Sequence, residues 1–217
     1  IFVNPTQFND KMDFKKYPRN IKRDISILKK LKVNYLFLPE VEEVYKKKMK
    51  NYTLSKSDKI LCAKHRKGHF EGVLNVMNRL LSIIKSKHVF MGEKDFQQYN
   101  LVKNILGKKY NVKIICCPTI REKNKIALST RNKLLNNSAI KKASKIANKL
   151  IKLKEISKTN NLINLSKLKK KLENKYKVQI DYLEFRDEKK LKLNNFKSKY
   201  RLFIAYYING IRLIDNF

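Results

Sequence analysis

Four residues with complementary chemistry stand together at Gly92-Glu93-Lys94-Asp95, at the end of a short apolar run. A glycine lets a ligand approach the backbone, a lysine places a positive charge near a phosphate, and an aspartate accepts hydrogen bonds from ribose hydroxyls or caps a helix. Gln98 follows on the helical face of Leu101 and Val102, so its amide needs a partner in the core or in a ligand. The segment indicates a nucleotide site, and an ordinary helix start explains it equally well.

Three further polar segments could bind anions. Leu128-Ser129-Thr130-Arg131-Asn132 combines hydroxyls, backbone N–H groups and an arginine in one short loop. Arg66-Lys67-Gly68-His69 is a basic turn before an apolar-periodic run, and it could hold a carboxylate near a helix N-terminus. Asn4-Pro5-Thr6-Gln7 follows the first apolar residues of the chain. In the first two segments, capping of the following helix is an alternative explanation.

Strand-like and helix-like patterns alternate through the first half of the chain, and this alternation predicts a parallel α/β sheet. The apolar runs that predict buried strands are 1–3, 33–38, 88–91 and 112–117. The three- and four-residue repeats that predict helices cover 20–28, 70–84 and 98–105. The polar stretch through Tyr17-Pro18-Arg19 is expected to be a loop. Ligands bind such sheets at the carboxyl ends of strands, which is where the first polar segment begins.

The pattern changes after about Ile120, which divides the chain into predicted domains at 1–119 and 120–217. Helices are expected over 139–150 and 165–176, joined by a polar surface connection at 158–164. Three strand-like runs follow, at 178–185, 201–208 and 211–214. The Asn209-Gly210 pair between the last two is typical of a type I′ hairpin turn. The C-terminal domain is therefore predicted to be α+β with antiparallel strands.

The formal charge is +34, and a basic surface of this size is found in proteins that bind nucleic acids. The lysines are spread along the chain, however, and no aromatic-and-arginine pattern for base stacking accompanies them. Lysine-rich solvated faces explain the charge better, and they would still attract an anion such as ATP. We therefore expect no specific nucleic-acid partner.

Several other classes of protein are disfavoured. No apolar run reaches the ~20 residues that span a bilayer, and the N-terminal apolar residues are too few for a signal peptide. Cys62, Cys116 and Cys117 form no CxxC pair and no disulfide framework, which favours a reducing cytoplasm. No Walker loop, GxGxxG or HExxH is present, and three scattered histidines name no metal site.

Taken in order, seven segments of this chain resemble the pantothenate synthetase (pantoate–β-alanine ligase) family from Ile1 to Phe217. They are IFVNPTQF, YPRN, RKGHFEGV, GEKDFQQ, PTIREKNKIALSTRN, DYLEFRD and RLIDN. The resemblance implies a Rossmann-like domain, related to nucleotidylyltransferases and class I tRNA synthetases, and a smaller C-terminal lid domain. It also implies that pantoate attacks the α-phosphate of ATP, and that β-alanine then attacks pantoyl adenylate and releases AMP. Such catalysis depends mostly on positioning and charge stabilisation.

The resemblance assigns roles to individual residues. It implies that Gln7 and Gln98 hold pantoate and that Gln7 also borders the β-alanine site. The residues that would bind ATP are Gly92, Glu93, Lys94, Asp95, Ile120, Leu128, Ser129, Thr130 and Arg131. Weaker candidates for the pantoate or β-alanine site are Asn4, Tyr17, Arg66 and His69. Family members tend to form homodimers, and Mg²⁺ is expected to arrive with ATP.

The chain departs from the family pattern at several places. No residue matches the HxGH histidine taken as the catalytic proton donor, and His65 and His69 are no substitutes, so no catalytic residue is assigned. We interpret the chain as N-terminally truncated and expect reduced activity and aggregation. The usual Asp-Gly before the phosphate loop is Asn124-Lys125 here, and Thr130 replaces a serine. Arg23 replaces one member of an acidic pair at Asp24, so no protein metal ligand is assigned.

Two other functions stay open from the sequence. One is a nucleotidylyltransferase with a different acceptor, against which the two glutamines and the VNPTQF segment argue. The other is the basic nucleic-acid-binding protein considered above. Adenylation of a carboxylate or phosphate other than pantoate would favour the first. DNA binding with a steep salt dependence at physiological ionic strength would favour the second.

Overall fold

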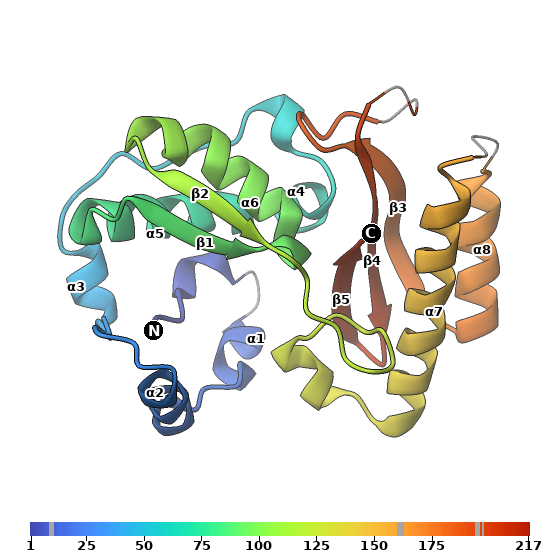
Figure 1. Ribbon diagram of the computed structural model, residues 1–217, viewed down its shortest axis with the longest axis horizontal. Helices are drawn as coiled ribbons and strands as arrows, with labels where there is room; N and C mark the ends of the chain where they lie inside the picture. Colours follow the sequence, from blue (N-terminus) through green and yellow to red (C-terminus); the bar gives the residue numbers. More distant parts are fainter. Residues whose placement is uncertain (9–10, 160–162, 194–195, 197) are drawn as a thin grey trace. The chain divides into compact units, whose positions relative to one another are not determined.

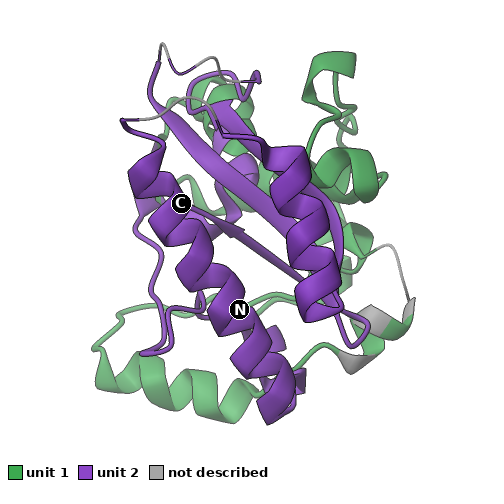
Figure 2. Ribbon diagram, turned by 90° about the vertical axis from the view of Figure 1, so that its right-hand side faces the viewer, with its two compact units in different colours: residues 1–89, 101–113 green, residues 90–100, 114–217 purple. Residues whose placement is uncertain are grey.

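A computed structural model of the protein describes residues 1–8, 11–159, 163–193, 196 and 198–217. The chain divides into two compact units, and neither follows the sequence continuously (Figure 2). Unit 1 comprises residues 1–89 and 101–113, and unit 2 comprises residues 90–100 and 114–217. The predicted boundary between residues 119 and 120 stays a prediction. No helix among the described residues is long and apolar enough to cross a membrane.

Unit 1 is mostly helical, and helix α5 (His69–Ile84) forms its centre. Gly68 precedes the helix with φ +81°, a conformation that favours glycine, and Phe70, Leu74 and Leu81 are buried on its inner face. The predicted helix at 70–84 is thus confirmed. The shorter elements before it are η1 (Pro5–Gln7), α1 (Lys11–Lys16), α2 (Ile21–Lys30), α3 (Val41–Tyr45), η2 (Lys56–Asp58) and α4 (Cys62–His65).

A β–α–β segment follows α5, as the sequence predicts (Figure 1). Strand β1 (His88–Gly92) leads through η3 (Glu93–Asp95) into α6 (Phe96–Val102) and the π-helical turn η4 (Lys103–Gly107). Strand β2 (Lys113–Cys117) then pairs with β1 in a parallel two-stranded sheet. The segment Gly92–Asp95, which the sequence indicates as a nucleotide site, lies at the junction between β1 and the helical stretch.

Unit 2 contains an antiparallel sheet in the order β3 (Gln179–Asp187), β4 (Tyr200–Ile208), β5 (Ile211–Asn216). Asn209 and Gly210 both have positive φ, of 49° and 74°, as a type I′ turn requires. Helices α7 (Asn137–Ile156) and α8 (Leu165–Tyr176) cover one face of the sheet (Figures 1 and 2). Their apolar faces, with Ile146, Leu150 and Leu172, pack with the strands into one core. The α+β prediction for this region is confirmed.

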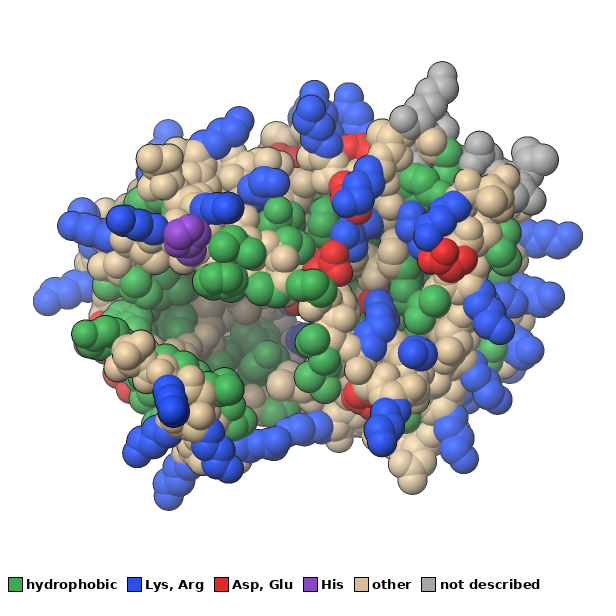
Figure 3. Space-filling model, in the orientation of Figure 1, with side chains coloured by type: hydrophobic (Ala, Val, Ile, Leu, Met, Phe, Trp, Pro, Cys, Tyr) green, Lys and Arg blue, Asp and Glu red, His purple; other side chains and the backbone are tan. Residues whose placement is uncertain are grey.

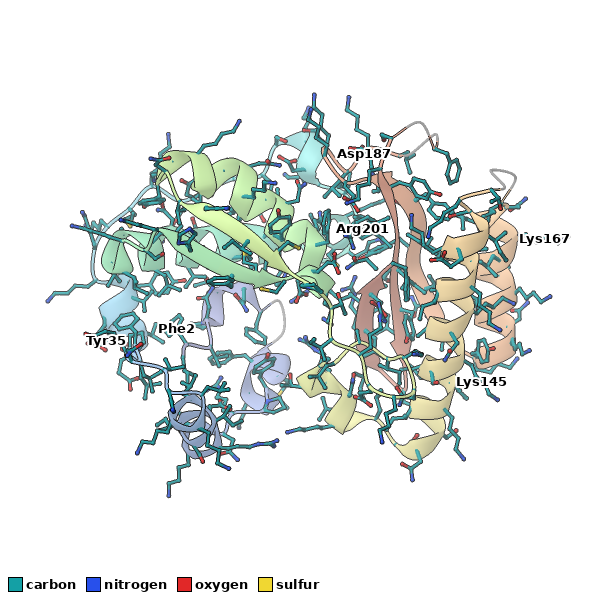
Figure 4. The ribbon with its side chains drawn as sticks, in the orientation of Figure 1. Phe2, Tyr35, Lys145, Lys167, Asp187 and Arg201 are labelled. Carbon is teal, nitrogen blue, oxygen red and sulfur yellow. The ribbon has the colours of Figure 1, made fainter. Side chains whose placement is uncertain are left out.

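Some local predictions are wrong. Residues 1–3 and 33–38 form no strand, because no strand among the described residues pairs with them. The second run is exposed throughout, and Tyr35 is 93% exposed (Figure 4). The stretch expected to be a loop before Tyr17 contains the short helix α1. Asp95 lies inside η3, which is preceded by Gly92, and does not cap a helix. Residues 160–162 of the predicted polar connection lie outside the described residues.

Candidate active site

The segment Gly92–Asp95 ends β1 and opens the helical stretch that follows. Gly92 is exposed, and a Cβ added to it would meet no heavy atom within 4 Å, so space exists beside its backbone. Lys94 Nζ lies 3.6 Å from Asp95 Oδ1, with Lys94 half-buried. A glycine with free space and a lysine shortly after it are suited to a phosphate group.

The second predicted segment forms a hairpin-like loop followed by a 3₁₀ turn. Leu128 N donates to Ile120 O at 2.8 Å, and Arg121 pairs with Ala127. This pairing places the side chains of Ile120 and Leu128, which are 68% and 59% exposed, on neighbouring positions. Two exposed apolar side chains beside a polar loop could contact a flat apolar ring such as adenine.

Ser129 caps the 3₁₀ helix η5 (Thr130–Leu134), because its Oγ accepts from Arg131 N at 3.3 Å. The capping explanation is therefore correct for Ser129. The hydroxyl of Thr130 is on an exposed residue, and Arg131 is half-buried. Buried Asn132 holds the loop from within, because its Nδ2 donates to Glu122 Oε1 at 2.8 Å and to Ala127 O at 3.0 Å.

The turn inside this loop contains the Asn124-Lys125 departure from the family pattern. Lys125 has φ +74°, which is a left-handed conformation that favours glycine. Lys125 N donates to Glu122 O at 2.8 Å, and Ile126 N donates to Asn124 Oδ1 at 3.0 Å. The turn thus keeps a glycine-type geometry with a lysine in it.

Strand β5 contacts both η3 and η5, so it links the two predicted ATP-binding segments within unit 2. Asp215 on this strand accepts two hydrogen bonds from Arg121, at 2.7 and 2.8 Å. Burial raises the pKa of Asp215, and the bonds from Arg121 oppose that rise. A buried bidentate pair of this kind fixes the start of the loop against the sheet.

In unit 1, three of the predicted residues, Asn4, Arg66 and His69, lie around Gln7. His69 Nδ1 lies 2.7 Å from Gln7 O, Arg66 Nη2 donates to the same oxygen at 3.4 Å, and Arg66 Nη1 lies 2.9 Å from His69 Nε2. Asn4, 3% exposed, donates to Gln7 Oε1 at 3.4 Å and accepts from Tyr45 at 2.7 Å. These contacts fix the backbone of Gln7, and among the described residues its amide oxygen accepts a long bond from Asn4.

Gly72 permits the close approach of this segment to α5. A Cβ on Gly72 would lie 2.4 Å from Thr6 O, closer than real Cβ atoms come to backbone oxygens. Asn4 Nδ2 also donates to Gly72 O at 3.2 Å. Gly72 therefore permits the close approach that determines where Gln7 lies.

The remaining candidates are placed separately. Tyr17 packs edge-on against Phe8, with ring centroids 5.4 Å apart, and Phe8 is the neighbour of Gln7. Gln98 is half-buried in α6 and belongs to unit 2, whereas Gln7 belongs to unit 1. Asp24 is half-buried on α2 beside exposed Arg23. No group of three His, Cys, Asp or Glu residues suited to a metal occurs among the described residues.

A cavity of about 280 Å³ lies within unit 2, lined in part by Glu93, Lys154, Arg201 and Asn216. Lys154 Nζ donates to Tyr200 O at 2.7 Å and lies 3.4 Å from the centre of the Tyr200 ring. Burial lowers the pKa of Lys154 to about 8. The cavity contacts the side chain of Glu93 and therefore borders the predicted ATP-binding segment.

Comparison with known proteins shows to which family the chain belongs. The family model described as Pantoate-beta-alanine ligase matches residues 1–217. The chain belongs to that family. A pantothenate synthetase of Flavobacterium psychrophilum is 39% identical over 224 residues, covering all of this chain and 79% of the relative. A Francisella tularensis pantoate–β-alanine ligase, solved with β-γ ATP and β-alanine, has 39% identity and a TM-score of 0.81 over all of this chain and 77% of its own.

A pantothenate synthetase of Thermus thermophilus has 29% identity and a TM-score of 0.90, over all of this chain and 81% of its own. Membership of the pantoate–β-alanine ligase family establishes the expected Rossmann-like fold with a smaller C-terminal domain. It also establishes the activity, an ATP-dependent C–N ligation of pantoate to β-alanine through pantoyl adenylate. The nucleotidylyltransferase alternative is therefore excluded.

The sequence did not single out the polar residues that support the predicted site. Arg201, Asp215 and Asn216 are buried or half-buried polar residues on β4 and β5, and none was predicted as functional. The signal available was a polar pair, Asp215-Asn216, ending an apolar strand pattern. Buried polar residues at such positions need partners. Here the partners are Glu93, in the segment Gly92–Asp95, and Arg121, at the start of the following loop.

Proposed function

We propose that, in this pantoate–β-alanine ligase, unit 2 supplies the ATP site. Gly92, Glu93, Lys94 and Asp95 would line the ribose and phosphates, with Lys94 facing phosphate. Ile120 and Leu128 would contact adenine, and Ser129, Thr130 and Arg131 would contact the phosphates. The observation that carries this proposal is that β5 contacts both segments, although they are far apart in the sequence.

We propose Gln7 and Gln98 as pantoate ligands, with Gln7 also bordering β-alanine. Amides bind hydroxyls and carboxylates without adding charge. The contacts of Arg66 and His69 to the Gln7 backbone support a role for these two residues, and for Asn4, in holding Gln7. Tyr17 would act through Phe8.

The proposed chemistry has two balanced steps. A carboxylate oxygen of pantoate attacks the α-phosphorus of ATP, the bond to the bridging oxygen breaks, and pyrophosphate leaves. The amine of β-alanine then attacks the acyl carbon, loses a proton, and displaces AMP. Lys94 and Arg131 would stabilise negative charge on the phosphates, and the remaining residues would position the reactants.

We propose no protein ligand for a metal, because Arg23 replaces one member of the family's acidic pair at Asp24. Mg²⁺ would accordingly enter on ATP. We also propose a homodimer, because members of the family tend to form one. We propose a cytoplasmic location, because the cysteines form no disulfide framework.

The decisive experiment is AMP formation by the purified protein with ATP, Mg²⁺, D-pantoate and β-alanine. AMP that requires both pantoate and β-alanine is the expected result. AMP formation that proceeds equally well with an unrelated carboxylate would contradict the proposed pantoate site.

A further inference from the structure

The side chain of Asn216, at the end of β5, is directed at the backbone of the Gly92–Asp95 segment. Its Nδ2 donates to two successive carbonyls, Glu93 O at 2.9 Å and Lys94 O at 3.0 Å. Asn216 is 3% exposed, so water does not replace these bonds readily. One amide therefore satisfies two carbonyls at the point where the predicted ATP-binding segment turns.

The orientation of this amide is determined by Arg201. Arg201 Nη1 donates to Asn216 Oδ1 at 3.0 Å, and Arg201 Nη2 donates to Glu93 Oε1 at 2.6 Å. The three residues form a closed ring of hydrogen bonds from β4 to β5 to η3. An inverted amide would direct Oδ1 at two carbonyl oxygens and NH₂ at a guanidinium, and would lose its bonds to all three groups.

Arg201 is itself held on two further sides. Its Nε lies 3.0 Å from Glu188 Oε1, and its guanidinium carbon lies 4.4 Å from the centre of the Phe96 ring. The contact with Glu188 is an ion pair without hydrogen-bond geometry, whereas the Nη2 bond to Glu93 is a charge-assisted hydrogen bond and is stronger than a neutral one. Arg201 is thus held by Glu93, Glu188 and Phe96, and none of these residues is exposed.

We infer that Asn216 is a positioning residue for nucleotide binding, which holds the backbone at Glu93 and Lys94 so that Gly92 and the Lys94 side chain meet the phosphates. The inference rests on the proposed ATP site. Asn216 does not touch the substrate in this assignment. It acts by removing the freedom of two peptide groups before ATP arrives, and that freedom would otherwise be lost on binding.

The side-chain requirements are narrow. Aspartate has the same shape but no donor, so it would place a carboxylate against two carbonyls and beside Glu93. Alanine would remove the side-chain donor from both carbonyls. Lysine at position 201 would keep a charge for Glu93 but could not bond Asn216 and Glu93 through one planar group.

The experiment compares Asn216→Asp and Arg201→Lys with the wild type. ATP affinity is measured by calorimetry, and hydrogen–deuterium exchange is measured by mass spectrometry without ATP. Asn174→Asp, an exposed amide on α8, is the matched control for charge and shape. We expect ATP to bind about tenfold more weakly to Asn216→Asp, with a smaller loss in Arg201→Lys. Hydrogen–deuterium exchange should rise at residues 93–96. It should stay unchanged in β3 and in the residues of β4 that pair with β3.

The other results separate the two proposals. If the wild type binds ATP and Asn216→Asp binds it equally well, the positioning role is wrong and the ATP site stands. If exchange rises throughout β3, β4 and β5, Asn216 only maintains the sheet, and the inference is again wrong. If the wild type itself binds no ATP, the proposed site fails together with the inference. Should Asn216→Asp not fold, Arg201→Lys provides the same comparison.

Discussion

Gly92 differs from Gly72 in what a methyl group would meet, although both are in motifs that the sequence singled out. Gly92 has φ −68° and free space around the Cβ position, so nothing in the fold requires a glycine there. A ligand that approaches the backbone would explain the glycine. This distinction leads to a test in which stability and binding respond differently.

For Gly92→Ala we expect unchanged or slightly higher stability, by up to about 1 kcal/mol, because alanine restricts the unfolded chain. ATP should bind at least about tenfold more weakly, because the methyl occupies the proposed phosphate approach. Thermal melting and calorimetric titration measure the two effects. Unchanged ATP affinity would show that no phosphate comes near this backbone.

Lys125 has a left-handed backbone conformation, which favours glycine over a residue with a side chain. Lys125→Gly should stabilise the protein by about 0.5–1 kcal/mol, because it removes the left-handed strain of φ +74°. Lys123→Gly, in the same turn and without positive φ, is the matched control and should destabilise by a similar amount. Urea unfolding of the three proteins measures the difference. Destabilisation by both changes would mean that the lysine is not strained.

Lys154 predicts a pH effect whose sign follows from linkage. Burial lowers the pKa of Lys154 from 10.5 to about 8, so between these values the unfolded chain binds more protons than the folded one. The contribution of this group to stability therefore rises with pH across that window. We expect the melting temperature of the wild type, relative to Lys154→Met, to increase from about pH 7 to about pH 10.

Exposed Lys152→Met on the same helix controls for the change in net charge and hydrophobicity. A difference between wild type and Lys154→Met that stays constant or shrinks with rising pH would contradict the shift. Melting curves in buffers of matched ionic strength provide the measurement.

At the scale of elements, the long periodic segments were predictable and the short apolar runs were not. Helices α5, α7 and α8 have repeats that bury one face, and the β4–β5 turn has a defined dipeptide. The run 33–38 has the composition of a buried strand but remains exposed and unpaired among the described strands. Strand formation depends on a partner elsewhere in the chain, and local composition does not contain that information.

The candidate site shows the same limit. Residues in contiguous motifs, such as Gly92–Asp95 and Leu128–Arg131, could be proposed from their types and from the family, and their roles stay predictions. Asn216 and Arg201 could not be proposed, because their importance arises from contacts across more than a hundred positions of sequence. The capping function of Ser129 was foreseen as an alternative and is correct.

The packing of η1 on α5 gives a prediction at this scale. Gly72→Ala should displace the Thr6–Gln7 backbone, because the new methyl would lie 2.4 Å from Thr6 O. We expect pantoate to bind at least about tenfold more weakly, with a loss of stability of about 1–3 kcal/mol from overpacking. Calorimetry with pantoate measures the affinity. Normal pantoate affinity in a folded variant would remove Gln7 from the proposed site.

At the scale of the molecule, the charge of +34 is distributed over both units (Figure 3). Lys145 on α7 and Lys167 on α8 point outward from the helices (Figure 4). Such a surface has a strong general attraction for anions but no arrangement that selects a base sequence.

We therefore expect DNA to bind this protein at low salt and to be released near about 0.15 M salt. Fluorescence anisotropy of a labelled duplex over a salt series measures this, with a random duplex of equal length as the control. Tight binding that persists at physiological salt would establish a nucleic-acid function beside the ligase activity.

The discontinuity of unit 2 also limits how this protein can be divided experimentally. The chain enters unit 2 at residue 90, returns to unit 1 at residue 101, and enters unit 2 again at residue 114. A fragment that began at residue 114 would contain β3, β4 and β5 but not the peptide groups to which Asn216 donates. The buried amide would then be exposed to solvent or left unsatisfied. Swapping C-terminal halves between ligases of this family would thus require the 90–100 segment to be exchanged as well.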